Sequence, residues 1–511
     1  MSAETTAIQS PDLDPPEIRL LTRARPQAVQ AWQVAVLAVH AALLVFALMH
    51  HERWFDEAQA WMLGRDASFK DLLLHYPRYE GSPPLWQLVL AVPAKLGAPY
   101  WTLSVISGVL AFTGAALIVI KAPFHPVIRA LLPFTYWLFF QYGVISRSYA
   151  LIAPILWLLA IAWPARFRRP WRMGVLALLL SLVSFHGFLI AAALMGLHAL
   201  WLRRKWRELP DRVRTVHAQV LAAFGLLTLF LFFELRTPGD VSVHGGVNSN
   251  PVTALNEARG MYTGAFSNRI PILLIVAATV WWLWSRRRLL LWLTPTVAVV
   301  AFFAVRYGNV WHQGVLVEIW LFALWVSLGD QTDLQETLGH ESVDRRELPR
   351  WAPQALAVGM LLVLSVQLVW TAKTIRYDYR NTYSAAAQTA AYLKTIGAPD
   401  VDIRARSVEA TALQPYFDRN PFRNVNRGHC PCFWWWSMKM PFHPARTWLV
   451  RGHPAAIVYG DKWPGHTHEL HRWPLPGYHV ARHFHGALYI RNQVFEHEGF
   501  WVLVPDSPTS P

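Results

Sequence analysis

The sequence predicts an α-helical polytopic membrane protein with about eleven transmembrane helices and a C-terminal extracytoplasmic α/β domain. Only 15% of its 511 residues are charged, whereas a soluble globular chain carries about 25%. Hydrophobic residues make up 54% of the chain, and most of them lie in long apolar runs. The net charge of +15 is concentrated in clusters between these runs, which is typical of membrane loops and does not indicate nucleic-acid binding. This composition excludes a disordered protein and argues against a soluble enzyme.

The apolar runs divide the chain into three parts. Residues 1–30 are polar and rich in proline, which predicts a disordered cytoplasmic N-terminus. The run 31–50 is about 20 residues long, enough to cross a bilayer as an uncleaved anchor. It opens a transmembrane domain over residues 31–371, with a first outer loop at 51–100. The further runs lie near 101–120, 127–141, 149–163, 173–185, 187–202, 216–235, 270–285, 289–305, 313–328 and 352–371.

The basic residues predict how these runs are oriented, because Lys and Arg are retained on the cytoplasmic side. All the basic clusters can face the cytoplasm only if residues 173–202 form a hairpin and residues 84–97 lie in the interface without crossing. The cytoplasmic loops then hold about twice as many Lys and Arg as the short outer loops. This arrangement predicts eleven spans, with the N-terminus inside and the C-terminus outside.

Residues 372–511 predict a separate α/β domain on the outer face. An amphipathic stretch at 384–397 favours a helix, and short β-like runs lie at Val450, 456–459, 489–490 and 500–504. The run Phe433–Trp436 has two interpretations. It inserts at the membrane surface, as indoles often do, or it packs in the domain core or against the membrane part.

Histidine and cysteine patterns in this domain have spacings like those of metal ligands. They are His429–Cys432 and the histidines at 466, 468 and 471. Two cysteines one residue apart are poor geometry for a structural zinc site, and we also expect them to be too close for a relaxed disulfide. No metal site is therefore assigned.

Candidate chemical groups lie at the predicted outer ends of the spans. Asp56 and Glu57 directly follow the first span, where carboxylates are costly unless they have a partner or a task. The alternative is that both cap an interfacial helix. Further polar groups in the outer loops are Glu80, Arg147, Tyr149, His186, Arg306 and His312. Each alone is typical of a snorkelling or capping residue, but together they predict a site for a lipid-linked anion beside an acidic base.

Five short motifs occur in an order that resembles a known family. They are Asp56-Glu57, Ser82–Trp86, Arg147–Leu151, Ser184–Gly187 and Val310–Gly314. Together they resemble the GT-C superfamily of polyprenyl-phosphate-sugar-dependent glycosyltransferases, particularly the bacterial protein O-mannosyltransferases and lipid A aminoarabinose transferases. The resemblance covers roughly residues 31–330. Ser82 stands where the family has His, and the first loop lacks an Asp-x-Asp pair.

The resemblance implies an inverting hexosyl- or pentosyltransferase that moves a sugar from polyprenyl phosphate to an acceptor hydroxyl. It makes Asp56 the catalytic base, with Glu57 beside it in the catalytic pair. Arg147 and Arg306 would offset the charge of the leaving phosphate. Tyr149, His186 and His312 complete the expected substrate-binding residues together with Glu80. Glu57 or Glu80 would orient the acceptor or a divalent cation, and no other cofactor is implied.

The expected location is the bacterial inner membrane, crossed many times, with the active site facing the periplasm. The expected partners are the bilayer, a polyprenyl-phosphate-linked sugar, and a glycan, lipid or protein acceptor. Two alternatives stay open: a transporter or flippase, and a non-catalytic scaffold of a polysaccharide assembly system. The sequence names neither the sugar nor the acceptor.

Overall fold

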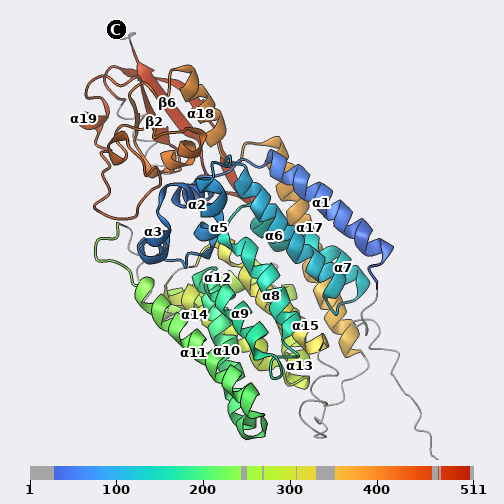
Figure 1. The fold of residues 1–511 in the computed structure, drawn as a ribbon. Helices are drawn as coiled ribbons and strands as arrows, with labels where there is room; N and C mark the ends of the chain where they lie inside the picture. The colour runs from blue at the N-terminus through green and yellow to red at the C-terminus, as the bar shows by residue number, and fades with distance from the viewer. Residues whose placement is uncertain are drawn as a thin grey trace, which may run out of the picture.

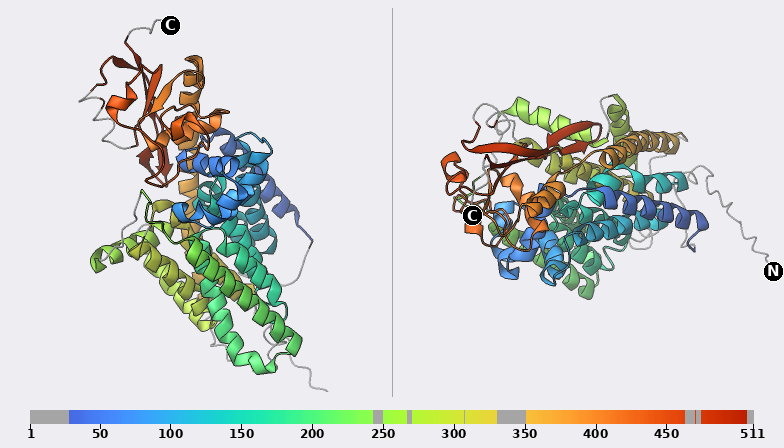
Figure 2. Two further views of the ribbon diagram at one scale, coloured as in Figure 1. Left: turned by 60° about the vertical axis from the view of Figure 1, so that its left-hand side comes forward. Right: turned by 90° about the horizontal axis from the view of Figure 1, so that it is seen from above.

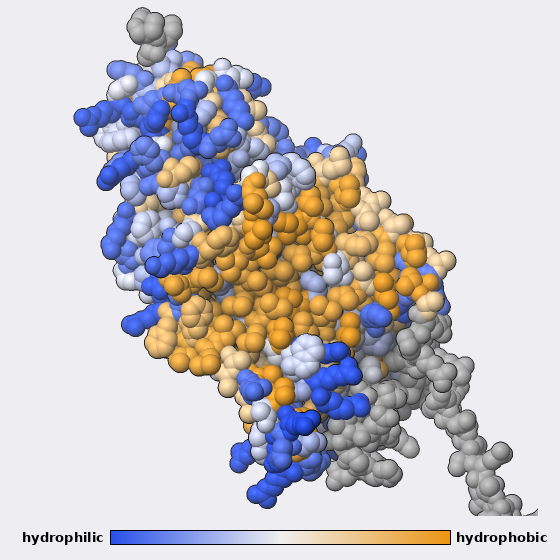
Figure 3. Space-filling view, in the orientation of Figure 1, coloured by the Kyte–Doolittle hydropathy of each residue, from blue (hydrophilic) through white to orange (hydrophobic). Residues whose placement is uncertain are grey.

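A computed structural model shows a helical bundle with a smaller mixed domain at one end (Figure 1). It describes residues 28–242, 250–266, 270–306, 308–329, 351–462, 470 and 474–506. A broad hydrophobic belt covers the middle of the bundle, and hydrophilic residues cover both ends (Figure 3). The chain is therefore a multi-pass membrane protein with a mixed-sheet domain at its C-terminal end.

Six helical segments in the described residues are long and apolar enough to cross a membrane. They are α1 (Ala31–His50), α6 (Thr102–Lys121), a segment that contains α10 (Phe185–Lys205), α11 (Asp211–Glu234), Val310–Gly329 with α15 (Gly314–Gly329), and α17 (Ala352–Arg380). A bent pair, Pro126–Val144 with Ser148–Ala162, would make a seventh. Shorter apolar helices are α5 (Leu85–Lys95), α9 (Pro170–Ser181), α13 (Ile270–Ser285) and α14 (Leu289–Val305). Several apolar spans are thus confirmed, whereas the count of eleven and the orientation stay predictions.

The segment predicted to form a hairpin is broken between α9 and α10. The Ser184 side chain caps α10 by accepting a hydrogen bond from the Gly187 backbone at 3.1 Å. A Cβ atom at Gly187 would lie 2.3 Å from the carbonyl oxygen of Leu180. Only glycine allows the two helices to approach this closely, so this residue fixes the break.

The first outer loop folds into four helices at one end of the bundle. They are α2 (Phe55–Asp66), α3 (Phe69–Leu74), α4 (Pro77–Glu80) and α5. Helix α5 has 11 residues and packs against α2. At about 1.5 Å per residue it is too short to cross the hydrocarbon core. The structure thus gives residues 84–97 the short helix expected of an interfacial segment.

The bent pair is irregular where it turns. Helix α7 (Pro126–Leu131) leads through η2 (Leu132–Phe134) into a buried π-helix, η3 (Trp137–Val144). After the turn, η4 (Ser148–Leu151) leads into α8 (Ile152–Ala162). The axis changes by 118°. π-Helical turns are frequent at functional sites, and this one is followed closely by Arg147, which pairs with Asp56 of α2.

The C-terminal domain contains a four-stranded mixed sheet in the order β1-β2-β6-β3. Its strands are β1 (Ile403–Ala405), β2 (Ala456–Gly460), β3 (Tyr478–Phe484) and β6 (Phe500–Pro505), and only β1 and β2 pair in parallel. The predicted helix is α18 (Ala386–Thr395). Val450, expected in a strand, instead ends the short helix α19 (Arg446–Leu449). Helix α17 runs past the boundary predicted at residue 371.

A separate hairpin connects this domain to the bundle. Strands β4 (Ala487–Ile490) and β5 (Gln493–His497) pair only with each other. Tyr489 stacks on Tyr377 of α17 with ring centroids 4.2 Å apart. The Arg491 guanidinium donates to the carbonyl oxygen of Gly264 in α12 (Pro251–Phe266) at 2.8 Å. These contacts tie the hairpin to α17 and α12, and the domain lies at the end of the bundle that also carries the helices of the first outer loop (Figure 2).

Candidate active site

The acid that follows the first span forms an ion pair with an arginine from the bent pair. Asp56 lies in the first turn of α2, and the guanidinium of Arg147 donates to its carboxylate. Both side chains are 24% exposed. This carboxylate is therefore held by a cation but remains accessible from outside, as an acceptor or donor substrate requires.

The neighbouring carboxylate has the opposite environment. Glu57 is fully buried and accepts hydrogen bonds from the backbone of Trp54 at 3.1 Å and of Ser146 at 2.7 Å. The His51 ring lies 3.2 Å from both Glu57 and Asp378 of α17. Glu57 thus ties together the first outer loop, the turn of the bent pair and the last span.

Neighbouring charges determine the protonation states of His51 and Glu57. Burial alone would lower the pKa of His51, but the carboxylates of Asp378 and Glu57 outweigh burial and raise that pKa to about 10. Burial likewise opposes ionisation of Glu57, and His51 with the backbone donors lowers its pKa nonetheless. An imidazolium therefore lies between two carboxylates at neutral pH.

Glu80 is a third carboxylate of the first outer loop that interacts electrostatically with Asp56. Its carboxylate accepts a hydrogen bond from the Gln59 amide at 3.0 Å. Burial raises the pKa of Glu80 to about 7, with a further contribution from Asp56 and opposition from Gln59 and Arg147. Of the two carboxylates expected to orient an acceptor or a cation, Glu57 is already surrounded by protein donors, while Glu80 is close to Asp56.

Three predicted residues form a ring cluster beside Arg147. The His186 and His312 rings lie 4.7 Å apart, and Tyr149 lies 6.0 Å and 5.6 Å from them. The Arg147 guanidinium lies 6.0 Å from the Tyr149 ring. Among the described residues, neither ring nitrogen of His186 has a hydrogen-bond partner. The cluster therefore offers a buried polar group next to the ion pair.

Arg306 lies apart from these contacts. It is exposed at the end of α14, and no carboxylate pairs with it in the part of the chain that the structure describes. The other seven predicted residues are connected, directly or through one neighbour.

The aromatic run of the C-terminal domain packs on the first outer loop. The Trp434 backbone donates to the Gln59 side chain at 2.8 Å, and Gln59 donates back to the Trp434 carbonyl. Trp435 lies 5.7 Å from Tyr79 and 6.3 Å from Tyr76 between ring centroids. Of the two interpretations of this run, the structure favours contact with the membrane part.

Two further charged residues reach α2 from the C-terminal domain, and the sequence analysis did not identify them. Buried Glu498 accepts hydrogen bonds from the Phe55 backbone at 3.0 Å and from the Ser384 hydroxyl at 2.7 Å. Lys462 places its ammonium 5.7 Å from the Trp54 ring. The sequence held a local hint for Glu498 alone, since a carboxylate stands there directly before the apolar run that forms β6.

Cys430 and Cys432, expected to be too close for a relaxed disulfide, are joined by a disulfide, with their Cα atoms 4.4 Å apart at the lower limit of the usual range. Asp66 is the third potential ligand near this pair, but its carboxylate already pairs with Arg65 and accepts from the Cys432 backbone. The histidines at 466, 468 and 471 lie outside the described residues.

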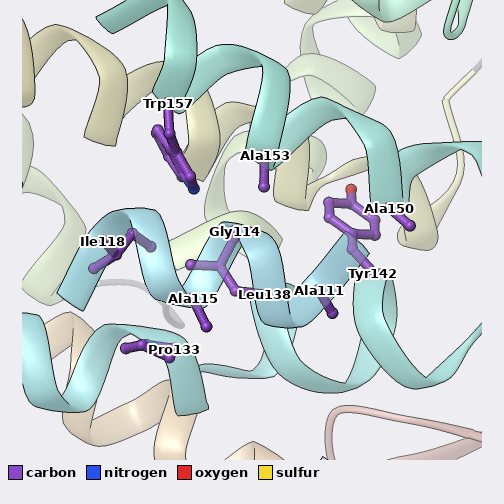
Figure 4. Close-up of a pocket in the computed structure, with 10 residues that line it drawn as sticks. All are labelled: Ala111, Gly114, Ala115, Ile118, Pro133, Leu138, Tyr142, Ala150, Ala153 and Trp157. Atoms are coloured by element: carbon purple, nitrogen blue, oxygen red, sulfur yellow. The ribbon is translucent and has the colours of Figure 1, made fainter. Parts of the chain in front are cut away.

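Next to the site, the bent pair packs on α6 around a small cavity (Figure 4). Gly114 of α6 lies opposite Ala153 and Trp157 of α8. Tyr142 also lines it, and its hydroxyl donates to the Trp311 carbonyl oxygen at 2.9 Å. The lining is almost entirely apolar, so this cavity does not fit a sugar phosphate.

Comparison with known proteins identifies a similar fold. No family model matches the sequence, and no curated protein matches it. The crystal structure of ArnT from Cupriavidus metallidurans in the apo state matches with a TM-score of 0.50 and 14% sequence identity, covering 92% of this chain and 97% of that chain. ArnT is a GT-C lipid A aminoarabinose transferase, so the resemblance expected from the motifs is confirmed at the level of the fold. The chain is a helical polytopic membrane protein with an ArnT-like architecture.

Proposed function

We propose that this protein is an inverting GT-C glycosyltransferase. It would move a sugar from a polyprenyl-phosphate donor to an acceptor hydroxyl at the outer face of the bacterial inner membrane. The accessible ion pair between Asp56 and Arg147 is the observation that carries the proposal. It combines a base and an anion-binding group at the end of the bundle that holds the C-terminal domain.

In this reaction Asp56 accepts the proton of the acceptor hydroxyl as that oxygen attacks the anomeric carbon. The bond between the anomeric carbon and the phosphate oxygen breaks, and its electron pair stays on the phosphate. A single displacement inverts the anomeric configuration. Arg147 offsets the charge that develops on the leaving phosphate. A guanidinium has five N–H donors, so Arg147 can contact the carboxylate and the phosphate together.

Glu57 acts as a positioning residue in this scheme. It binds the backbone of Ser146 while its neighbour Asp56 binds Arg147. Two adjacent residues of α2 are thus paired with two adjacent residues of the bent pair. This double contact fixes the distance between the base and the arginine.

The first experiment is native mass spectrometry of purified Asp56→Asn, together with a transfer assay. A variant without the base should retain its donor, so a co-purified polyprenyl-phosphate hexose or pentose would establish the class and identify the sugar. Asp71→Asn is the matched control, because Asp71 is a half-buried carboxylate of the same loop that accepts a hydrogen bond from Ser68, the N-cap of α3. Wild-type activity in Asp56→Asn would remove Asp56 as the base and favour the scaffold or transporter alternatives.

A further inference from the structure

The C-terminal domain brings a second cation to the outer-loop segment that carries Asp56. The Lys462 ammonium lies 5.7 Å from the Trp54 ring, and the Arg147 guanidinium lies 5.8 Å from the same ring. Lys462 also lies 5.9 Å from the Phe55 ring, directly before Asp56. Two cations from distant parts of the chain therefore approach the N-terminal end of α2 together.

The fold holds Lys462 in this inward position. The residue directly follows Asp461 at the end of β2, where Asp461 accepts from the Gly499 backbone at 2.6 Å and contacts His483 at 3.3 Å. The Lys462 side chain is only 18% exposed, and its ammonium pairs with Glu496 of β5 at 3.1 Å. A surface lysine would normally extend into water, so its burial against aromatic rings requires a reason.

The lysine stays charged in this place. Burial lowers the pKa of Lys462, but Glu496 and Asp56 outweigh burial, and the net shift is upward. Glu496 itself is 27% exposed. Both side chains are therefore partly exposed, although the Glu496 oxygen that contacts the ammonium is itself buried. An anionic ligand of Lys462 would compete with this oxygen for the ammonium.

We propose that Lys462 is a phosphate-binding residue, so that the donor phosphate is held between Arg147 of the membrane domain and Lys462 of the C-terminal domain. This inference rests on the proposed function. The donor phosphate is a diester with one negative charge, and breaking its bond to the sugar leaves a monoester that carries up to two. One cation balances the single negative charge of the donor diester, and a second stabilises the additional charge that develops as the monoester leaves. Lysine binds phosphate as a compact point charge.

The competing explanation is that Lys462 only links the two domains through Glu496. The two explanations differ for Glu496→Gln. If the pair is purely structural, this variant should lower the stability of the protein and leave its affinity for phosphate unchanged. If Lys462 binds phosphate, loss of the Glu496 charge frees its ammonium, and the variant should bind phosphate more tightly.

The test measures binding of undecaprenyl phosphate and of undecaprenol to the purified full-length protein in nanodiscs. Lys462→Met should weaken binding of the phosphate at least about tenfold, because a charge-assisted hydrogen bond is lost. It should leave undecaprenol binding unchanged. Lys462→Arg should stay close to wild type, and Glu496→Gln should bind the phosphate more tightly.

Lys394→Met is the matched control, since Lys394 of α18 lies 5.3 Å from the Phe417 ring and should not affect binding. Wild-type affinity of Lys462→Met for undecaprenyl phosphate would overturn the inference and leave the proposed function intact. If Lys462→Met fails to fold, reduced or unchanged affinity in Glu496→Gln overturns the inference instead. A wild-type protein that binds undecaprenyl phosphate no better than undecaprenol would overturn the proposed function itself.

Discussion

Helix α11 and the bent pair around Arg147 cross the same bundle in opposite ways. Helix α11 is regular over 24 residues, and only 17% of its most apolar window is buried. The bent pair turns by 118° and contains a π-helix whose eight residues are all buried. Backbone polar groups that face lipid must be satisfied within the helix. A break in a membrane helix is tolerated only where protein surrounds it. There the backbone N–H groups at the break can donate hydrogen bonds to groups outside the helix.

The break in the bent pair supplies contacts to the candidate site. The Ser146 backbone donates to Glu57, and Arg147 pairs with Asp56. In a regular helix the backbone N–H of Ser146 would instead bind a carbonyl oxygen of the helix itself. Irregular backbone, buried charge and candidate chemistry therefore coincide at the end of the bundle that holds the C-terminal domain, while lipid-facing segments such as α11 stay regular.

The largest effect on transfer is expected for Arg147, the cation at the break, in comparison with a cation that follows the regular helix α11. Arg147→Met should reduce transfer by about 10²–10³-fold, the usual cost of one group that stabilises developing charge. Folding should change little, because the ion pair is partly exposed and such pairs contribute about 0–1 kcal/mol. Transfer kinetics and thermal unfolding measure the two effects.

Arg236→Met provides the comparison, since Arg236 is exposed just after α11. It should keep wild-type activity. Equal losses in the two variants would mean that general positive charge at the outer face matters, and the break would lose its special role.

The second effect concerns stability. Glu57→Gln removes one partner of a buried ion pair and weakens the contact with Ser146, which should destabilise the protein by about 3 kcal/mol. Glu208→Gln is the control, because Glu208 pairs with Lys205 at a side-chain exposure of 61%. That variant should unfold within about 0.5 kcal/mol of wild type. Thermal unfolding in detergent distinguishes them, and a stable Glu57→Gln would show that the buried cluster does not hold the break in place.

Much of this division was predictable from the sequence. Apolar runs predicted the membrane-spanning helices because lipid imposes a simple composition over about 20 residues. Asp56 and Arg147 could be assigned to one face because the distribution of Lys and Arg orients the loops. Their direct pairing depends on the break before Arg147, and no local pattern reveals a π-helix.

The unpredicted residues share a cause, because their roles come from long-range packing. Lys462 and Glu498 lie in the last fifth of the chain and reach α2 only after the C-terminal domain docks. Asp378 lies in the last turn of a long apolar helix, where its partner His51 leaves no trace in the sequence. Arg306 was predicted in the same way as Arg147, from its position in an outer loop, but the structure leaves it exposed and apart from the other predicted residues, so its role stays a prediction.

A third effect is the dependence of stability on pH. His51 has a folded-state pKa of about 10 against an ordinary 6.5, so its contribution to stability is fully present below about pH 6.5 and is lost as the pH rises through 10. Glu80 and Glu498, with pKa values raised from 4.5 to about 7 and about 8, also reduce stability as the pH rises, but they do so between about pH 4.5 and 8, so the fall above pH 8 belongs to His51. The unfolding temperature should therefore fall by several degrees between pH 7 and 10, and His51→Gln should flatten that fall. An equal fall in both proteins would exclude a charged His51 from the cluster.

The smallest expected effect tests whether buried charge always marks chemistry. Glu318 lies in α15, a regular helix that is buried almost throughout. Among the described residues, neither of its carboxylate oxygens has a hydrogen-bond partner. An unpaired charge inside the bilayer is costly, and the proposed transfer at the outer face gives this group no task. Glu318→Gln should therefore leave transfer unchanged and should not lower the unfolding temperature.

A transporter coupled to protons would need a carboxyl that titrates within the membrane, and it would lose function in the neutral isostere. Loss of activity in Glu318→Gln, with folding intact, would therefore contradict the assignment of the chemistry to the bent pair. It would place the chemistry inside a regular span and give the transporter alternative the strongest support.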